Sequence, residues 1–139
     1  MGMKIPVLAL VLVASTFMGS GQAATYGDTD DAYQDCQLFL NPGHELTLEE
    51  SIRANSCVNF VIGAWDMGEY LSWKSVFLGT EPPFCPPEEG IDVAKAIQAF
   101  VTYVEEHPEE IEHRLAMVLE MSFENAFPCT DDYFTKLAY

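Results

Sequence analysis

Basic residues are scarce in this 139-residue chain, which has six Lys and Arg against 22 Asp and Glu and a formal net charge of −16 at pH 7. Nucleic-acid binding depends on neutralising phosphates with Lys and Arg, and anionic membrane surfaces attract the same side chains. The composition therefore argues against nucleic acid and membrane surfaces as partners. An acidic surface either keeps a protein soluble or attracts a basic protein partner.

The sequence also lacks the motifs of common catalytic sites. It contains no Gly-x-Ser-x-Gly nucleophile turn, no phosphate-binding loop and no dinucleotide-binding glycine pattern. His107 and His113 do not have the i, i+4 spacing of a two-histidine zinc site, and His44 stands in a Pro-Gly turn. The glutamates beside His113 are typical of an acidic helix start. We therefore predict that the chain is not an enzyme and has no catalytic residue, metal site or cofactor.

The only long apolar run covers residues 5–18, which is shorter than the ~20 residues of a membrane-spanning helix. It follows Lys4 and is followed by small residues up to Ala23. This order of charge, apolar stretch and small-residue exit is typical of a secretory signal peptide. We predict that residues 1–23 are the signal peptide and that residues 24–139 form one soluble helical domain. No membrane insertion is expected after cleavage, which would change the net charge from −16 to −17.

Breakers and caps divide the predicted mature chain into helices. A short helix is expected over residues 31–40, and the capping box from Thr47 to Glu50 opens a long helix that reaches about residue 78. Asp92 can cap a third helix, and Pro108 suits the first position of a fourth. The expected fold class is all-α, a small four- to five-helix disulfide-stapled orthogonal bundle.

Apolar residues at helical spacing predict the buried faces of these helices. They are Ile52, Val58, Val61, Ile62, Trp65 and Leu71 on the long helix, Val93, Ile97, Phe100, Val101 and Val104 on the third, and Ile111, Leu115, Val118, Leu119, Ser122 and Ala126 on the fourth. Gly63 and Gly68 either admit close packing against the long helix or kink it. Tyr70, Trp73 and Phe77 on the same helix are typical of a core, although Trp and Tyr are also common interface anchors.

The mature chain has four cysteines, and an even number in a small exported domain indicates two disulfides. Spacing alone allows three pairings. The tight His107-Pro108 corner predicts antiparallel third and fourth helices, so the residues before the third lie beside those after the fourth. Cys85 then pairs with Cys129, and Cys36 pairs with Cys57 by elimination.

Four segments, in order, form a recognisable pattern: Cys57-x-x-Phe60-Val61-x-Gly63-x-x-Asp66, Phe84-Cys85-x-Pro87, Tyr103-x-x-x-His107-Pro108-Glu109 and Ala126-Phe127-Pro128-Cys129. Their order and spacing resemble the Rap/Tai family of immunity proteins. The resemblance covers about residues 55–129 and rests on the whole series, because no single segment is specific.

This resemblance implies a periplasmic, helical and often homodimeric protein that binds a peptidoglycan amidase delivered by type VI secretion and blocks its cleft. Such inhibition needs no catalytic residue in the immunity protein. An acidic projection, supplied by the proline-rich connector over residues 79–90 or by the long helix, would enter a more basic cleft. The candidate contact residues are Asp66, Glu69, Glu81, Glu88 and Glu89.

Two alternatives remain open from the sequence. A small periplasmic acid-stress chaperone would release hydrophobic faces when its many carboxylates become protonated, and it would suppress aggregation at about pH 2–3. The same fold could also serve another envelope partner, because a fold does not determine a function.

Overall fold

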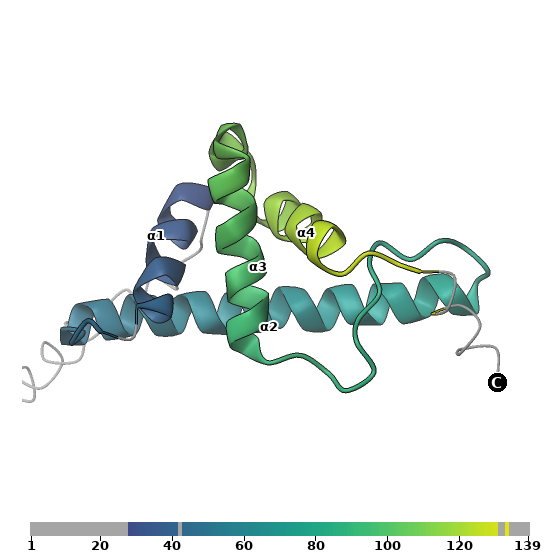
Figure 1. Cartoon of the computed structure of the whole chain (residues 1–139), viewed down its shortest axis with the longest axis horizontal. Coiled ribbons are helices and arrows are strands. Elements are labelled where there is room, and N and C mark those ends of the chain that lie inside the picture. Colours follow the sequence, from purple (N-terminus) through teal and green to yellow (C-terminus); the bar gives the residue numbers. More distant parts are fainter. Residues whose placement is uncertain (1–27, 42, 131–132, 134–139) are drawn as a thin grey trace, which may run out of the picture.

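The computed structural model describes residues 28–41, 43–130 and 133 of the chain. Its helices are α1 (Thr29–Leu40), α2 (Leu48–Phe77), α3 (Val93–Glu106), the 3-10 helix η1 (Pro108–Glu112) and α4 (Leu115–Ala126). The long α2 forms a base, and α1, α3 and α4 pack against one side of it (Figure 1). The predicted fold class, a small all-α bundle with two disulfides, is confirmed. The predicted signal peptide lies outside the described residues.

The capping box predicted at the start of α2 is present. The Thr47 hydroxyl accepts a hydrogen bond from the Glu50 backbone N–H at 3.2 Å, and Glu50 Oε2 accepts one from the Thr47 N–H at 2.8 Å. His44 Nε2 lies 3.2 Å from the second carboxylate oxygen of Glu50. Two backbone N–H groups that the first helical turn would leave unpaired are thereby satisfied.

We expect Glu50 to contribute to a loss of stability in acid. Its hydrogen bonds, of which that from the Thr47 backbone has the largest effect, lower the pKa of Glu50 from 4.5 to about 2. The unfolded chain therefore takes up this proton more readily, so the stabilisation is present above pH 4.5 and is lost as the pH falls to about 2. The free energies of unfolding of wild type and Glu50→Gln, measured with urea, should converge as the pH falls from 4.5 to about 2. A constant difference between the two would contradict the assignment.

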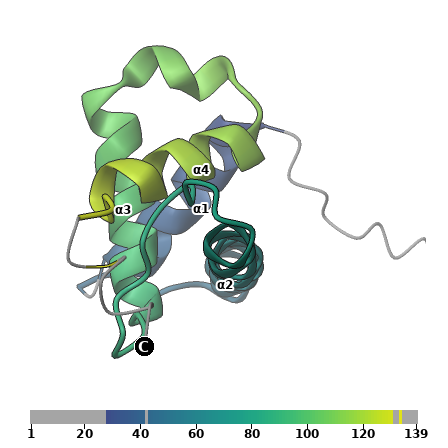
Figure 2. The same ribbon diagram turned by 90° about the vertical axis from the view of Figure 1, so that its right-hand side faces the viewer.

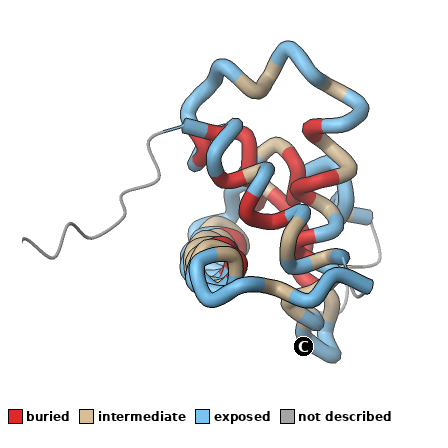
Figure 3. The backbone as a smooth tube through the Cα atoms, turned by 90° about the vertical axis from the view of Figure 1, so that its left-hand side faces the viewer, coloured by how far each residue is buried: buried red, intermediate tan, exposed pale blue. Residues whose placement is uncertain are grey.

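The hydrophobic core lies where α1, α3 and α4 meet the middle of α2. Figure 3 shows the buried segments of these helices turned toward one another. The inner face predicted for α3 is confirmed for Ile97, Phe100, Val101 and Val104, which are buried, whereas Val93 is only partly buried. The periodicity of α3 was therefore a reliable guide to its packing.

On α2 the predicted inner face is only partly correct. Val61 and Trp65 are buried, but Ile52, Ile62 and Leu71 are 61%, 41% and 41% exposed. With 30 residues, α2 is about 45 Å long, whereas α3 has 14 residues and is about half that length. The shorter helices therefore cannot cover the whole of α2, and apolar residues at its ends and flanks remain at the surface.

The connector between α2 and α3 is anchored at its middle by Phe84, which was not among the residues predicted for the core. The Phe84 side chain is 1% exposed, and its ring centroid lies 5.1 Å from that of Trp65. The buried Ser72 hydroxyl donates a hydrogen bond to the Phe84 carbonyl at 2.7 Å. The proline-rich connector is therefore held against α2 and does not form a free projecting loop along its whole length.

Gly68 provides the space for the Phe84 ring. A Cβ atom at Gly68 would lie 2.5 Å from Phe84 Cε1, whereas one at Gly63 would have no heavy atom within 4 Å. We expect Gly68→Ala to lower the free energy of unfolding by about 1–3 kcal/mol, because a packed ring must shift. Gly63→Ala should raise it by up to about 1 kcal/mol through helix propensity. Denaturant unfolding measures the stability of both variants. A loss of stability in Gly63→Ala as well as in Gly68→Ala would contradict the predicted difference between the two positions.

Two disulfides connect segments that are distant in the sequence. Cys36–Cys57 joins α1 to α2, and Cys85–Cys129 joins the connector to the segment that follows α4. These are the two pairings derived above from the order of the helices. The Cys85 N–H also donates a hydrogen bond to the Phe127 carbonyl at 2.9 Å, so the backbone and the disulfide fix the same junction.

The connection between α3 and α4 differs from the tight antiparallel corner that was predicted. η1 follows α3, and His113 and Arg114 have extended backbones before α4 begins. As a result, α4 crosses α3 and does not run back along it (Figure 2). The extended residues hold the start of α1, because Thr29 Oγ1 donates a hydrogen bond to the His113 carbonyl at 2.6 Å and Asp28 forms an isolated antiparallel bridge with Arg114.

The inner face of α4 is largely as predicted. Leu115, Val118, Leu119 and Ser122 are buried, and Phe123 is buried as well. Ile111 is only partly buried because it belongs to η1, and Ala126 is exposed at the last turn. The next residue, Phe127, packs inward instead, with its ring centroid 5.0 Å from that of Trp65.

Candidate functional site

The second half of α2 borders surface hollows on both of its flanks. Trp65 and Ser72 are buried and mark the side of the helix that faces the core. The flank that carries Asp66 and Glu69 borders the start of α3, whereas the flank that carries Met67 borders α4. One helix therefore offers two surfaces to partners, and their chemistry differs.

The first surface is an acidic–aromatic face formed by Asp66, Glu69, Tyr70 and Trp73, which line one shallow depression. These residues have i, i+3, i+4 and i+7 spacing, so they share one side of the helix. Tyr70 is 53% exposed and Trp73 is 60% exposed, and the Trp73 ring stacks on Phe77 with centroids 5.8 Å apart. Large exposed aromatic side chains with neighbouring charges are typical of a protein-binding surface.

Two of the five predicted contact residues, Asp66 and Glu69, thus lie together in the acidic–aromatic face. Tyr70 and Trp73 were not among the predicted contact residues, although their spacing from Asp66 was a usable signal. Periodicity alone could not identify them as surface residues, because the aromatic residue Trp65 on the same helix is buried.

The remaining predicted contact residues are exposed on the connector. Glu88 and Glu89 line a hollow next to the Cys85–Cys129 disulfide, and Tyr133 lines the same hollow. Burial, and then the negative charge of Glu69, raise the pKa of Tyr133. Glu81 lies on the connector shortly after Phe77, the last residue of α2.

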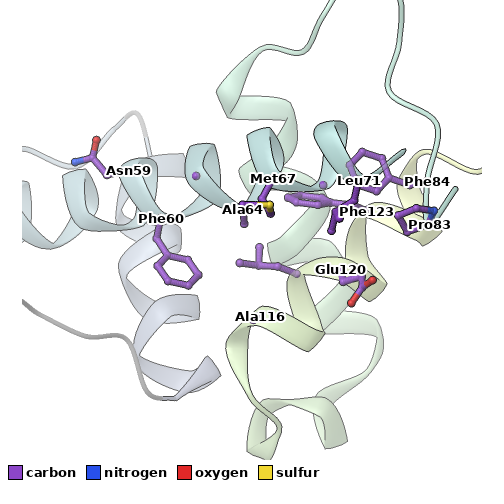
Figure 4. A pocket seen from close by; sticks show the side chains of 13 residues that line it. Asn59, Phe60, Ala64, Met67, Leu71, Pro83, Phe84, Ala116, Glu120 and Phe123 are labelled. Atoms are coloured by element: carbon purple, nitrogen blue, oxygen red, sulfur yellow. The ribbon is translucent and has the colours of Figure 1, made fainter. Parts of the chain in front are cut away.

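The second surface is an apolar groove of about 470 Å³ between α2 and α4. Its lining residues are Asn59, Phe60, Gly63, Ala64, Met67, Gly68, Leu71, Pro83, Phe84, Ala116, Leu119, Glu120 and Phe123. Figure 4 shows Phe60, Met67 and Phe123 around this space, whereas Asn59 points away from it, and Glu120 is the only charged residue of the lining. The groove depends on how α4 crosses α2, so the sequence analysis gave no sign of it.

The described residues contain no cluster of side chains that could hold a metal ion. In this part of the chain, no three His, Cys, Asp or Glu side chains are placed to hold a metal ion, and the described cysteines are all in disulfides. His44 and His113 each lie within hydrogen-bond distance of a neighbouring glutamate, Glu50 and Glu110. Among the described residues, no helix is both long enough and apolar enough to cross a membrane.

These features define a class: small, strongly acidic helical proteins that contain internal disulfides and expose large aromatic side chains on one helix. A family model of Rap1a immunity proteins matches residues 28–129, a range that includes both disulfides and both surfaces of α2. The chain therefore belongs to the Rap1a family of immunity proteins of type VI secretion, and the resemblance found in the sequence is confirmed. Comparisons with curated proteins and with solved structures gave no match.

Proposed function

We propose that this immunity protein acts in the periplasm, where it binds and blocks a peptidoglycan amidase effector of type VI secretion. Membership of the Rap1a family supports a role in immunity. Two disulfides favour an oxidising compartment, and the signal-peptide pattern of residues 1–23 favours export. The proposal includes the homodimer that the family resemblance implies.

The observation that carries this proposal is the acidic–aromatic face of α2. Tyr70 and Trp73 expose more than half of their surface, and burying such side chains against a partner provides large binding energies at interface centres. Asp66 and Glu69 lie beside them and favour a partner whose cleft is basic. The net charge of −17 expected after cleavage of residues 1–23 extends this attraction over a distance and accelerates association.

Inhibition on this account is steric. The face occupies the approach to the amidase cleft, and the immunity protein contributes binding and exclusion of substrate without taking part in a reaction. The face belongs to a helix that the Cys36–Cys57 disulfide joins to α1 and against which Phe84 packs, so little conformational entropy is lost on docking.

A protection assay tests the proposal. A peptidoglycan amidase effector of type VI secretion would be directed to the periplasm of a sensitive bacterium, and lysis would be followed with and without the full-length chain. We expect protection by the full-length chain and none by a variant without residues 1–23, which stays in the cytoplasm. Protection by both forms would overturn the proposed site of action. Protection against an effector that leaves peptidoglycan intact would overturn the proposed target.

A further inference from the structure

A further hollow, the α2–α3 hollow, lies between α2 and the start of α3 and adjoins the acidic–aromatic face. It has a volume of about 360 Å³, and its uncharged lining residues are Ile62, Trp65, Gly90, Ile91, Val93 and Ala96. The remaining lining residues are Asp66 and Glu69, which also line the depression that contains Tyr70 and Trp73. The two carboxylates therefore border both an apolar hollow and a pair of exposed aromatic side chains.

We propose that the α2–α3 hollow receives the side chain of one arginine of the amidase effector, whose guanidinium is held by Asp66 and Glu69. This inference rests on the proposed function and deepens it, because it names the chemical group that the acidic–aromatic face recognises. Three properties of the hollow carry it: two carboxylates without a cation, an apolar lining, and aromatic neighbours.

Asp66 and Glu69 have no basic partner within the described part of the chain. The ion pairs found there involve other carboxylates, and neither Lys74 on α2 nor Lys95 on α3 lies within 4.0 Å of these two. Like charges three residues apart on a helix repel each other. A cation that binds between them removes this repulsion and gains the attraction of both.

The lining of the hollow suits the aliphatic stem of a long basic side chain. Trp65 is only 6% exposed, and its ring packs against those of Phe84, Phe123 and Phe127 with centroids 5.0–5.2 Å apart. Ile62 is 41% exposed and therefore has apolar surface left to cover. Long basic side chains bury their methylene groups against apolar surface while the charged group stays at a polar edge. A fixed apolar lining beside two carboxylates matches both parts of such a side chain.

Arginine fits this site better than lysine. Its planar guanidinium can donate hydrogen bonds to both carboxylates at once, whereas an ammonium group is a compact and strongly hydrated charge. The weaker hydration of the guanidinium also lowers the cost of entering a largely apolar hollow. Tyr70 and Trp73 adjoin the same carboxylates, and a guanidinium stacks favourably on aromatic rings.

Filling the hollow tests the proposal. Ile62→Trp should lower the affinity of the mature protein for the purified amidase effector at least about tenfold, because the indole takes the space of the arginine stem. The matched control is Ile52→Trp, which places the same side chain on the same helix at a site that is 61% exposed and outside the hollow. Asp66→Asn with Glu69→Gln should also lower the affinity at least about tenfold, because it removes both charges and keeps the shape. Circular dichroism of each variant establishes that it is folded.

Chemical modification identifies the group that enters the hollow. Phenylglyoxal reacts with the guanidinium of arginine, and mass spectrometry of the effector locates the modified residues. In the complex with the wild type, one arginine of the effector should lose most of its reactivity. It should become reactive again in a complex saturated with the variant that carries Asp66→Asn and Glu69→Gln.

Three results would overturn this inference and leave the proposed function intact. They are effector binding that Ile62→Trp does not change, an equal loss of affinity in Ile52→Trp, and a complex in which no arginine of the effector is protected. The absence of any binding between the wild type and the effector is a different result. It would overturn the proposed function, and this inference with it.

Discussion

Replacement of Trp73 by alanine should lower the affinity for the amidase effector about a hundredfold. Trp73 is 60% exposed and stands beside Asp66 and Glu69, in the position of an interface anchor. Truncating such an anchor typically costs about 2–4 kcal/mol of binding energy, and each 1.4 kcal/mol corresponds to about a tenfold change. Isothermal titration calorimetry with the purified effector measures the change, and Trp73→Phe should restore part of the lost affinity.

Charge reversal on the same face tests how far its acidic residues accelerate association, separately from the contribution of its aromatic residues to affinity. Asp66→Lys with Glu69→Lys should slow association and reduce its dependence on salt, because both acids attract a basic cleft. The control is Glu106→Lys with Glu112→Lys, which changes net charge equally near η1, at the end of α3 remote from α2 (Figure 1). An equal loss in the control pair would show that only the overall charge matters, and it would contradict recognition by this face.

The connector provides a second comparison. Charge reversal at Glu81, Glu88 and Glu89 should weaken binding if the acidic residues of the connector also enter the cleft. Glu88 and Glu89 line the same hollow, and Glu81 is not among its lining residues. We therefore expect Glu88→Lys with Glu89→Lys to have a larger effect than Glu81→Lys. Unchanged affinity in all of these variants would exclude the connector from the interface.

Loss of the Cys85–Cys129 disulfide should produce the second large effect, on stability. This disulfide closes a loop with a sequence separation of 44, and the chain-entropy relation gives about 4 kcal/mol for its contribution. The Cys36–Cys57 disulfide, with a separation of 21, should contribute about 3 kcal/mol. A small domain has only about 5–15 kcal/mol of total stability, so either loss is a large fraction of it.

Denaturant unfolding of the two double serine variants, compared with wild type, measures these contributions. The Cys85→Ser, Cys129→Ser variant should also weaken effector binding more, because this disulfide fixes the connector that anchors Phe84 beside α2. A larger loss of stability for Cys36→Ser with Cys57→Ser would contradict the loop-length argument.

Local signals in the sequence were sufficient for most of the fold. Thr47 and Glu50 cap α2 as expected, and Asp92 caps α3 by accepting a hydrogen bond from the Ala94 N–H at 2.9 Å. These features depend on residues a few positions apart, which a single sequence displays. The order of the helices also restricted which cysteines could meet.

Features that depend on tertiary contacts could not be predicted. Phe84 reaches the core through a connector whose path no local rule specifies, and Ile62 and Leu71 are exposed because α2 is longer than the helices that cover it. Extended residues after η1 turned α4 across α3, which replaced the expected antiparallel pair.

The same distinction applies to the two surfaces of α2. The acidic–aromatic face lies on one helix, and its i, i+3, i+4 and i+7 spacing is visible in the sequence once its helical phase is known. The apolar groove is formed by two helices that are separated by more than thirty residues, so only the structure shows it.

Hydroxyl-radical footprinting of the mature protein, alone and with the amidase effector, tests the central claim that α2 binds its target through the acidic–aromatic face. Oxidation of Tyr70 and Trp73 should fall several-fold in the complex, while oxidation of the exposed Met117 on α4 stays as it is in the free protein. A Trp73 side chain that remains equally reactive when the effector is bound would contradict the account.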